Sequence, residues 1–156
     1  MYNRVLAPLD TSERAERILP HLESLSSIKQ GHVVLLHVVE PAVFMPAPPG
    51  AMAAPGAGAG TAYEDVIERM RTSAEEYLSK IQSRLEERGI PSEIVIDIGS
   101  VVERIIHTAE EKQVDLIAIA SHGRTGLSRV FFGSVAAGVL HRSEVPLLLV
   151  RSRDES

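Results

Sequence analysis

A phosphate group is the ligand best suited to the segment Ser121–Ser134, which combines glycines with hydroxyl residues and leads into a predicted helix. Glycine lets a backbone turn with positive φ and come close to a ligand. The amides of Gly133, Ser134 and Val135 stand at the predicted helix start, where backbone N–H groups lack helical partners and attract anions. Alternatively, Gly133 and Ser134 form only a turn and a helix cap, since the segment matches neither the P-loop nor the dinucleotide-binding fingerprint.

A carboxylate, Asp10, follows the first apolar run of the chain. In this position it could accept a hydrogen bond from a ribose hydroxyl, or help to hold Mg²⁺ beside phosphates. It could equally cap the next helix, because Glu13 stands three residues further on, as in a capping box. The two roles do not exclude each other, and both stay open.

Six histidines could suggest a metal or acid–base site, but the chain has no HExxH pair and no cysteine. We therefore expect each histidine to be solvated or hydrogen-bonded. His122 is the exception that merits a test, because it lies inside the candidate phosphate loop. Neither a serine nucleophile elbow nor a pair of carboxylates sharing a pocket is evident, so an efficient enzyme is not predicted.

The elements that must position these residues alternate between short apolar runs and longer stretches of helical periodicity, which is typical of βαβ units. Strands are predicted at Arg4–Leu9, His32–Val39, Ser92–Ile98, Leu116–Ala120 and Val145–Val150. Helices are predicted at Ser12–Ser27, Tyr63–Arg88, Ser100–Gln113 and Gly133–Arg142. The predicted fold is α/β: an open, doubly wound, five-stranded parallel sheet, Rossmann-like, with helices on both faces.

In sheets of this kind, ligands bind outside the carboxyl ends of the strands, where the strand order reverses. If the first strand is central, with the second and fourth strands beside it, the functional segments follow Leu9, Val39 and Ala120. The glycine-containing loop is the segment after Ala120.

Two of the helices carry further expectations. Ser100 and Glu103 have the spacing of a capping box at the start of the third helix. The longest helix repeats apolar residues at three- and four-residue steps, as a core-facing helix does. These residues are Val66, Ile67, Met70, Ala74, Leu78, Ile81 and Leu85.

The length of 156 residues predicts one domain, 1–156, and a composition of 44% hydrophobic and 24% charged residues predicts a packed core. The net charge is −5 and no stretch concentrates lysine or arginine, so no nucleic-acid partner is expected. Pro41–Ala62 is uncharged, but 17 of its 22 residues are Pro, Gly or Ala. It predicts a flexible loop rather than a membrane span. The lack of cysteine and of a basic-then-apolar leader in Met1–Leu9 favours the cytoplasm.

The glycine spacing resembles the ATP-binding signature of universal stress proteins: glycine, two residues, glycine, nine residues, glycine, then serine or threonine. In this chain Ala120 stands at the first glycine, Gly123 at the second, and Gly133-Ser134 complete the pattern. Further segments that look like the family are Arg4–Glu13, Leu36–Val38, Val114–Ile119 and Val145–Val150. The resemblance covers nearly the whole chain except Pro41–Ala62 and implies an adenine nucleotide alpha hydrolase-like fold.

The resemblance also implies that ATP, with Mg²⁺, is the bound cofactor. Pro8 and Asp10 would lie on the ribose and phosphate side, and Asp10 is the candidate ligand of Mg²⁺. Val38 would offer backbone hydrogen bonds to adenine, and Ile119 would pack on the base. The remaining implied contacts are Ala120, His122, Gly123, Gly133, Ser134 and Val135.

The leading hypothesis is an ATP-binding regulatory protein of the stress response, and the resemblance implies a homodimer through the strand Val145–Val150. One alternative is a slow ATPase, or a protein that phosphorylates its own hydroxyls, such as Ser121, Thr125 or Ser128. Another is a nucleotide-free dimeric scaffold, because Ala120 adds a methyl group where the signature has glycine.

Overall fold

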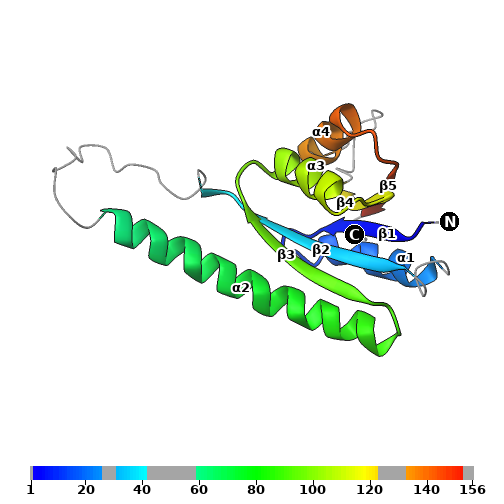
Figure 1. Cartoon of the computed structure of the whole chain (residues 1–156), viewed down its shortest axis with the longest axis horizontal. Coiled ribbons are helices and arrows are strands. Elements are labelled where there is room, and N and C mark those ends of the chain that lie inside the picture. Colours follow the sequence, from blue (N-terminus) through cyan, green and yellow to red (C-terminus); the bar gives the residue numbers. More distant parts are fainter. Residues whose placement is uncertain (1, 26–30, 42–58, 123–132, 153–156) are drawn as a thin grey trace.

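Five parallel strands form one sheet in the computed structural model, which describes residues 2–25, 31–41, 59–122 and 133–152 (Figure 1). The strands are β1 (Arg4–Pro8), β2 (His32–Val39), β3 (Ser92–Ile98), β4 (Leu116–His122) and β5 (Leu147–Ser152). Their order is β3-β2-β1-β4-β5. The open parallel sheet predicted from the sequence is confirmed, and β1 is its central strand with β2 and β4 beside it.

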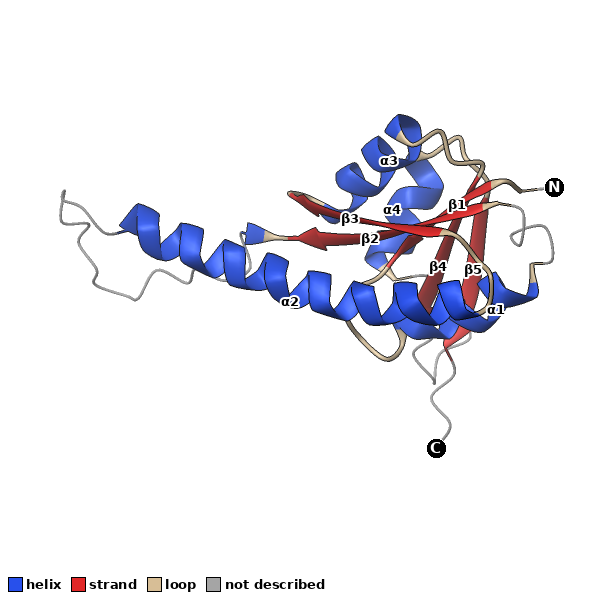
Figure 2. Ribbon diagram, turned by 60° about the horizontal axis from the view of Figure 1, so that its bottom comes forward, coloured by secondary structure: helices blue, strands red, loops and turns tan. Residues whose placement is uncertain are grey.

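Helices cover both faces of the sheet, as predicted for a doubly wound fold (Figure 2). The short 3₁₀ helix η1 (Ala15–Ile18), α1 (Leu19–Ser24) and α2 (Ala59–Glu87) lie on one face, and α3 (Val101–Glu111) and α4 (Ser134–Arg142) lie on the other. A hydrophobic core lies on each face of the sheet. Alternate residues of each central strand pack into one core or the other, because successive strand side chains point to opposite faces. Val5 and Ala7 pack beneath η1, α1 and α2, whereas Leu6 packs beneath α3 and α4.

The strands differ in burial according to their place in the sheet. Val5, Leu6 and Ala7 of β1 are fully buried, which fits an apolar strand covered on both faces. The edge strand β3 is partly exposed along its whole length, and so are Leu147–Val150 of the other edge strand, β5. Among the described residues, no helix is both long enough and apolar enough to cross a membrane.

The first predicted helix, Ser12–Ser27, is wrong in extent. The chain forms a 3₁₀ turn from Ala15 and becomes α-helical only from Leu19 to Ser24. Pro20 explains the difference, because it has no N–H to donate to the carbonyl of Glu16 and its ring would clash with that carbonyl. The α-helix therefore begins with Pro20 in its first turn, where a missing N–H costs nothing.

The predicted capping box at α3 is also wrong in its bonding. Ser100 does occupy the N-cap position with an extended backbone, but its side chain makes no capping hydrogen bond. Glu103 instead lies 3.9 Å from the guanidinium of Arg142 on α4. The helix thus starts where the pattern predicted, but Glu103 pairs with Arg142 of α4 and does not take part in a capping box.

Other boundaries differ by a few residues from the predictions. Helix α2 begins at Ala59 rather than Tyr63, β4 continues to His122, and β5 runs from Leu147 to Ser152. Most of the predicted loop Pro41–Ala62 lies outside the described residues, as does the predicted phosphate-loop segment 123–132. The apolar stripe predicted for α2 is buried at Ala74, Leu78, Ile81 and Leu85 but is 43% exposed at Val66. The prediction of a core face therefore holds for the second half of the helix only.

Candidate functional site

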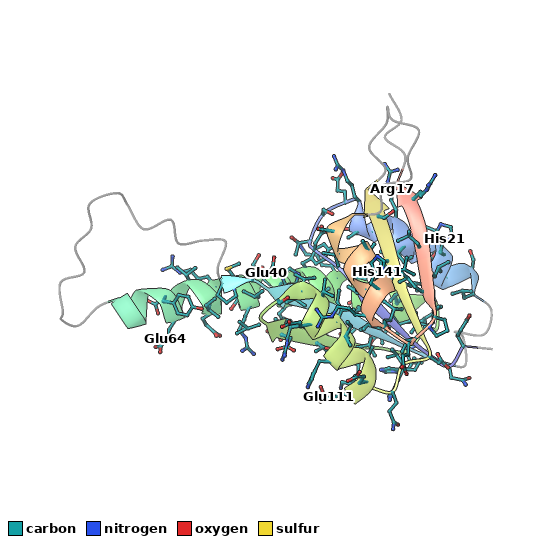
Figure 3. All side chains as sticks on the ribbon, turned by 90° about the horizontal axis from the view of Figure 1, so that it is seen from above. Arg17, His21, Glu40, Glu64, Glu111 and His141 are labelled. Carbon is teal, nitrogen blue, oxygen red and sulfur yellow. The ribbon has the colours of Figure 1, made fainter. Side chains whose placement is uncertain are left out.

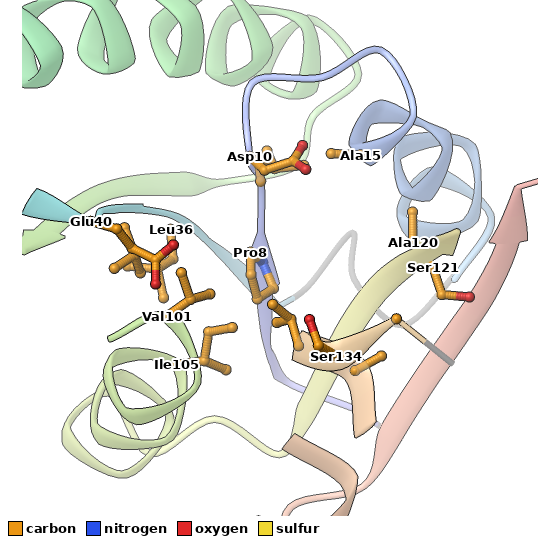
Figure 4. A pocket seen from close by; sticks show the side chains of 15 residues that line it. Pro8, Asp10, Ala15, Leu36, Glu40, Val101, Ile105, Ala120, Ser121 and Ser134 are labelled. Atoms are coloured by element: carbon orange, nitrogen blue, oxygen red, sulfur yellow. The ribbon is translucent and has the colours of Figure 1, made fainter. Parts of the chain in front are cut away.

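A cavity of about 320 Å³ opens at the carboxyl edge of the sheet, where β1 and β4 part (Figure 4). The two strands pair only at Val5 with Leu116 and at Leu6 with Ile117, although β4 continues to His122. The chain leaves β1 toward β2 on one side and reaches β4 from α3 on the other, so this is the point where the strand order reverses. Such a point is the usual ligand crevice of doubly wound sheets, and the volume falls within the range of small-molecule sites.

The loop after β1 is held in a defined shape beside the cavity. An Asp10 carboxylate oxygen, Oδ1, accepts hydrogen bonds from the amide and the hydroxyl of Ser12, the former at 3.0 Å. Thr11 between them has φ +66°, a left-handed conformation that is uncommon for a β-branched residue. Asp10 therefore closes a local turn instead of capping α1, and Oδ2 has no hydrogen bond with the described residues.

His37 on β2 also holds the loop after β1 in place, through a hydrogen bond to its backbone. Its Nδ1 lies 2.8 Å from the carbonyl oxygen of Leu9, and since a carbonyl only accepts, Nδ1 carries the proton. The amide of Leu9 in turn donates to the carbonyl of Leu36 at 2.8 Å. Two hydrogen bonds from β2 thus fix the place where Asp10 leaves the sheet, and this histidine acts as a hydrogen-bonding residue, as expected.

An apolar wall lies on the β2 and α3 side of the cavity. Leu36 and Val38 of β2 contribute to it, and so do Val101 and Ile105 from the first turns of α3. Ile105 is fully buried and Val101 is partly exposed, so the wall is part of the core and opens toward the cavity. Glu40, just beyond β2, adds an exposed carboxylate at the rim.

The opposite side is formed by β4 and the start of α4. Gly133 is the N-cap of α4, with φ −55° and ψ 156°, and no side chain of the described residues makes a capping hydrogen bond there. The amides of Ser134, Val135 and Ala136 belong to the first helical turn, whose N–H groups have no acceptor within the helix. All three residues line the cavity, as do Ala120 and Ser121 of β4. The positive end of α4 therefore faces the cavity.

Seven of the ten residues named from the sequence line this one cavity: Pro8, Asp10, Val38, Ala120, Gly133, Ser134 and Val135. Ile119 is 6% exposed in the core beneath α3 and α4 and is not among the lining residues. His122 ends β4, and Gly123 lies outside the described residues. Sequence reasoning missed Val101 and Ile105 because helical periodicity marks them only as core, and no local pattern shows that α3 begins beside β2.

A buried hydroxyl on α2, that of Tyr77, lies within the electrostatic influence of Glu16 and Asp10. Burial raises the pKa of Tyr77 far above its usual range, and the negative charges of Glu16 and then Asp10 raise it further. The Tyr77 hydroxyl is buried and faces Glu16 without reaching full hydrogen-bond geometry. Within the described parts of the chain, no three His, Cys, Asp or Glu side chains gather to form a metal site.

Comparison with known proteins places this architecture in a family. The model of the universal stress protein family matches residues 1–151. Universal stress protein MJ0577 of Methanocaldococcus jannaschii is 30% identical over 99% of this chain and 98% of its own length. The chain belongs to the universal stress protein family. The resemblance read from the glycine spacing is thereby confirmed.

Solved structures agree with this membership. This universal stress protein superposes on the structure of MJ0577 with a TM-score of 0.79, with 28% identity and 99% of each chain covered. A universal stress protein from Archaeoglobus fulgidus, solved in complex with dAMP, gives a TM-score of 0.60 at 23% identity, over 96% of this chain and 98% of that one. A universal stress protein solved in complex with cAMP gives 0.64 at 18% identity, over 96% and 97%. The last two likenesses are of fold.

Proposed function

We propose that the cavity binds an adenine nucleotide, ATP in particular, and that the protein is a regulatory stress-response protein controlled by nucleotide occupancy. The observation that carries the proposal is the meeting, in one cavity, of the uncapped start of α4, the Asp10 turn and the apolar wall at Val38. Helix amides suit phosphate, a carboxylate suits a ribose hydroxyl, and an apolar wall suits a base. Two fold relatives were solved with adenine nucleotides, which supports this choice of base.

The residues present fit the groups of ATP and a magnesium ion. Ser134, Val135 and Ala136 would donate their amides to phosphate oxygens. Asp10 keeps Oδ2 for a ribose hydroxyl or for Mg²⁺, while its Oδ1 remains in the local turn. When bound, the nucleotide supplies a triphosphate whose negative charge complements the positive end of α4.

Gly133→Asp tests the proposal, because it should affect folding and binding in opposite directions. A Cβ at this position meets no atom of the described residues within 4 Å and φ is ordinary, so the described fold accepts the side chain. Aspartate is a good N-cap and should maintain or raise the melting temperature. Its charge beside the phosphates should weaken ATP binding, measured by isothermal titration calorimetry, by about a hundredfold.

The matched control is Gly133→Asn, which has the same shape and caps the helix without the charge. It should retain much more ATP affinity than the aspartate variant. Equal ATP affinity in the wild type and both variants would place the phosphates elsewhere. Native mass spectrometry of the purified protein adds a direct readout, namely whether an adenine nucleotide accompanies the chain.

The nucleotide-free scaffold is tested at Ala120, which lines the cavity and is partly exposed. If its methyl group crowds the ligand, Ala120→Gly gains ATP binding that the wild type lacks. If the wild type already binds, the substitution changes affinity little. Slow ATP hydrolysis is tested separately: the wild type should then release more phosphate than the Gly133→Asp variant. Ser121, a candidate acceptor of phosphate, lines the cavity and is 5% exposed.

We also propose a homodimer through β5. This strand is at the sheet edge, and its apolar residues Leu147–Val150 are all partly exposed. An unpaired apolar edge strand is a ready template for a second chain. Light scattering at micromolar concentration should give twice the mass of one chain, and a monomer would contradict the proposal.

A further inference from the structure

Helix α2 is much longer than the strands that it covers. Its 29 residues span about 44 Å at 1.5 Å per residue, whereas the seven residues of β3 span about 23 Å. Ala74 is the first buried residue in the described part of α2, and the α2 residues that pack in the core cluster beneath the sheet are Tyr77, Leu78, Ile81 and Leu85. The first half of α2 therefore extends beyond the carboxyl edge of the sheet, where Figure 3 shows Glu64 far from the body of the molecule.

This overhanging half still carries the apolar stripe of a packed helix. Tyr63 is 39% exposed and Val66 is 43% exposed, while Ile67 and Met70 are partly exposed. These positions continue, at three- and four-residue steps, the buried run that starts at Ala74. A stripe of large apolar side chains exposed to water on one helix face marks an interaction surface.

The charges beside the stripe are complementary to a second copy of the same helix. In a heptad frame Tyr63 and Met70 occupy d, Ile67 and Ala74 occupy a, and Glu64 and Arg71 both occupy e. When two copies run antiparallel, with Ile67 of each opposite Met70 of the other, Glu64 of each copy lies beside Arg71 of the other. Opposite charges thus meet twice across a two-fold axis, as a symmetric contact requires.

We propose that the overhanging half of α2, residues 63–73, is a self-association surface on which a second copy of this chain docks antiparallel, with reciprocal Glu64–Arg71 pairs. Within one helix these residues are seven positions, or about 10.5 Å, apart along the axis, too far to pair. Any energetic coupling between them must therefore arise between copies. The contact is short, so the association is weak and concentration-dependent.

Among the described residues, none of those that line the proposed nucleotide site comes from α2. The contact is also separate from the β5 edge, since β5 and the β3 edge near α2 lie at opposite ends of the sheet. A protein that used both contacts would assemble beyond a dimer. Mass alone therefore cannot assign the surface, and the decisive measurement is the coupling between positions 64 and 71.

Charge reversal tests this coupling in the full chain by sedimentation velocity over a wide range of concentrations. Glu64→Arg and Arg71→Glu each place two like-charged pairs in the contact, and each alone should weaken the association about tenfold. Both residues are exposed, so both variants should fold. An equimolar mixture of the two single variants brings opposite charges together again and should restore the association, as should the double variant.

Glu76→Arg is the matched control, because it makes the same charge change at an exposed position outside the stripe. It should leave the association unchanged. The proposal is overturned if the single variants associate like the wild type, if mixing restores nothing, or if the control weakens association equally. It is also overturned if Val66→Glu lowers the melting temperature without changing the mass, because the stripe would then be covered within one chain.

Discussion

Among single residues, Thr11 stands out because it holds a left-handed backbone, φ +66°, beside Asp10. That conformation costs an L-residue roughly 1–2 kcal/mol, and glycine avoids it at some cost in chain entropy. Thr11→Gly should therefore raise the free energy of unfolding by about 0.5 kcal/mol in urea titrations. Thr11→Ala keeps a Cβ and should gain less, so equal gains from the two would show that φ is not the cause.

Single residues also show how far sequence reasoning reaches into the site. Asp10 and Gly133 were predicted because each carries a local signal, a carboxylate after a strand and a glycine at a helix start. Val101 and Ile105 carry no such signal, since their place in the cavity depends on how α3 packs against a strand more than sixty residues earlier in the chain. The role of Asp10 as an N-cap was also undecidable from spacing, because Pro20 moves the start of α1.

Among elements, α1 depends most on its neighbours, because six residues are too few for a self-sufficient helix. Glu23, with 14% of its side chain exposed, lies 2.7 Å from Arg88 and 3.5 Å from Arg84, both on α2. Glu23→Gln should lower the free energy of unfolding by about 1 kcal/mol, because Arg84 and Arg88 lose the mostly buried carboxylate with which they pair. Chemical denaturation measures the loss.

Glu86→Gln, at an exposed position of α2, is the control and should change stability little. If Arg88→Gln in the Glu23→Gln background costs as much as it does in the wild type, the two side chains are not coupled and the ion pair contributes nothing. The length of α1 was overestimated from the sequence, because the spacing of apolar residues carries no information about the missing N–H of Pro20.

At the scale of the whole molecule, a cluster of charges joins β2, β3 and α3 at the amino edge of the sheet, opposite the cavity. The Lys112 ammonium lies 2.9 Å from Glu93, and His32 lies 3.5 Å from the other oxygen of that carboxylate. Burial opposes ionisation of Glu93, but the hydrogen bond and charge of Lys112, helped by His32 and Arg4, lower its pKa. The cluster stabilises the edge only while Glu93 is charged.

The pH dependence follows from the direction of that shift. A carboxylate whose pKa is lowered by folding contributes stability above its unfolded pKa, near 4.5, and loses it as pH falls through the folded value. Glu93→Gln should therefore cost about 1 kcal/mol at neutral pH, and the difference from the wild type should shrink in acid. Urea titrations from neutral to acid pH measure this; Glu110→Gln, exposed on α3, should show no such change.

The overall architecture was accessible from sequence because alternating strands and helices permit few topologies. Strand order was only conditional, since the pattern of apolar runs does not say which strand is central. The splitting of β1 from β4 after Leu6, which opens the cavity, is a property of the assembled sheet. The overhang of α2 could not be predicted from the sequence either, because the apolar periodicity of the helix continues unchanged past the point where the sheet beneath it ends.

That overhang divides one continuous helix into two thermodynamic zones. Residues from Tyr77 onward share the core, so their amides should exchange with solvent deuterium only through large-scale opening. Residues 63–73 rest on intrinsic helix propensity in a single chain, and their amides should exchange far faster. Exchange mass spectrometry on dilute protein should therefore find a step in protection near Ala74, and raising the protein concentration should slow exchange only on the amino-terminal side of it.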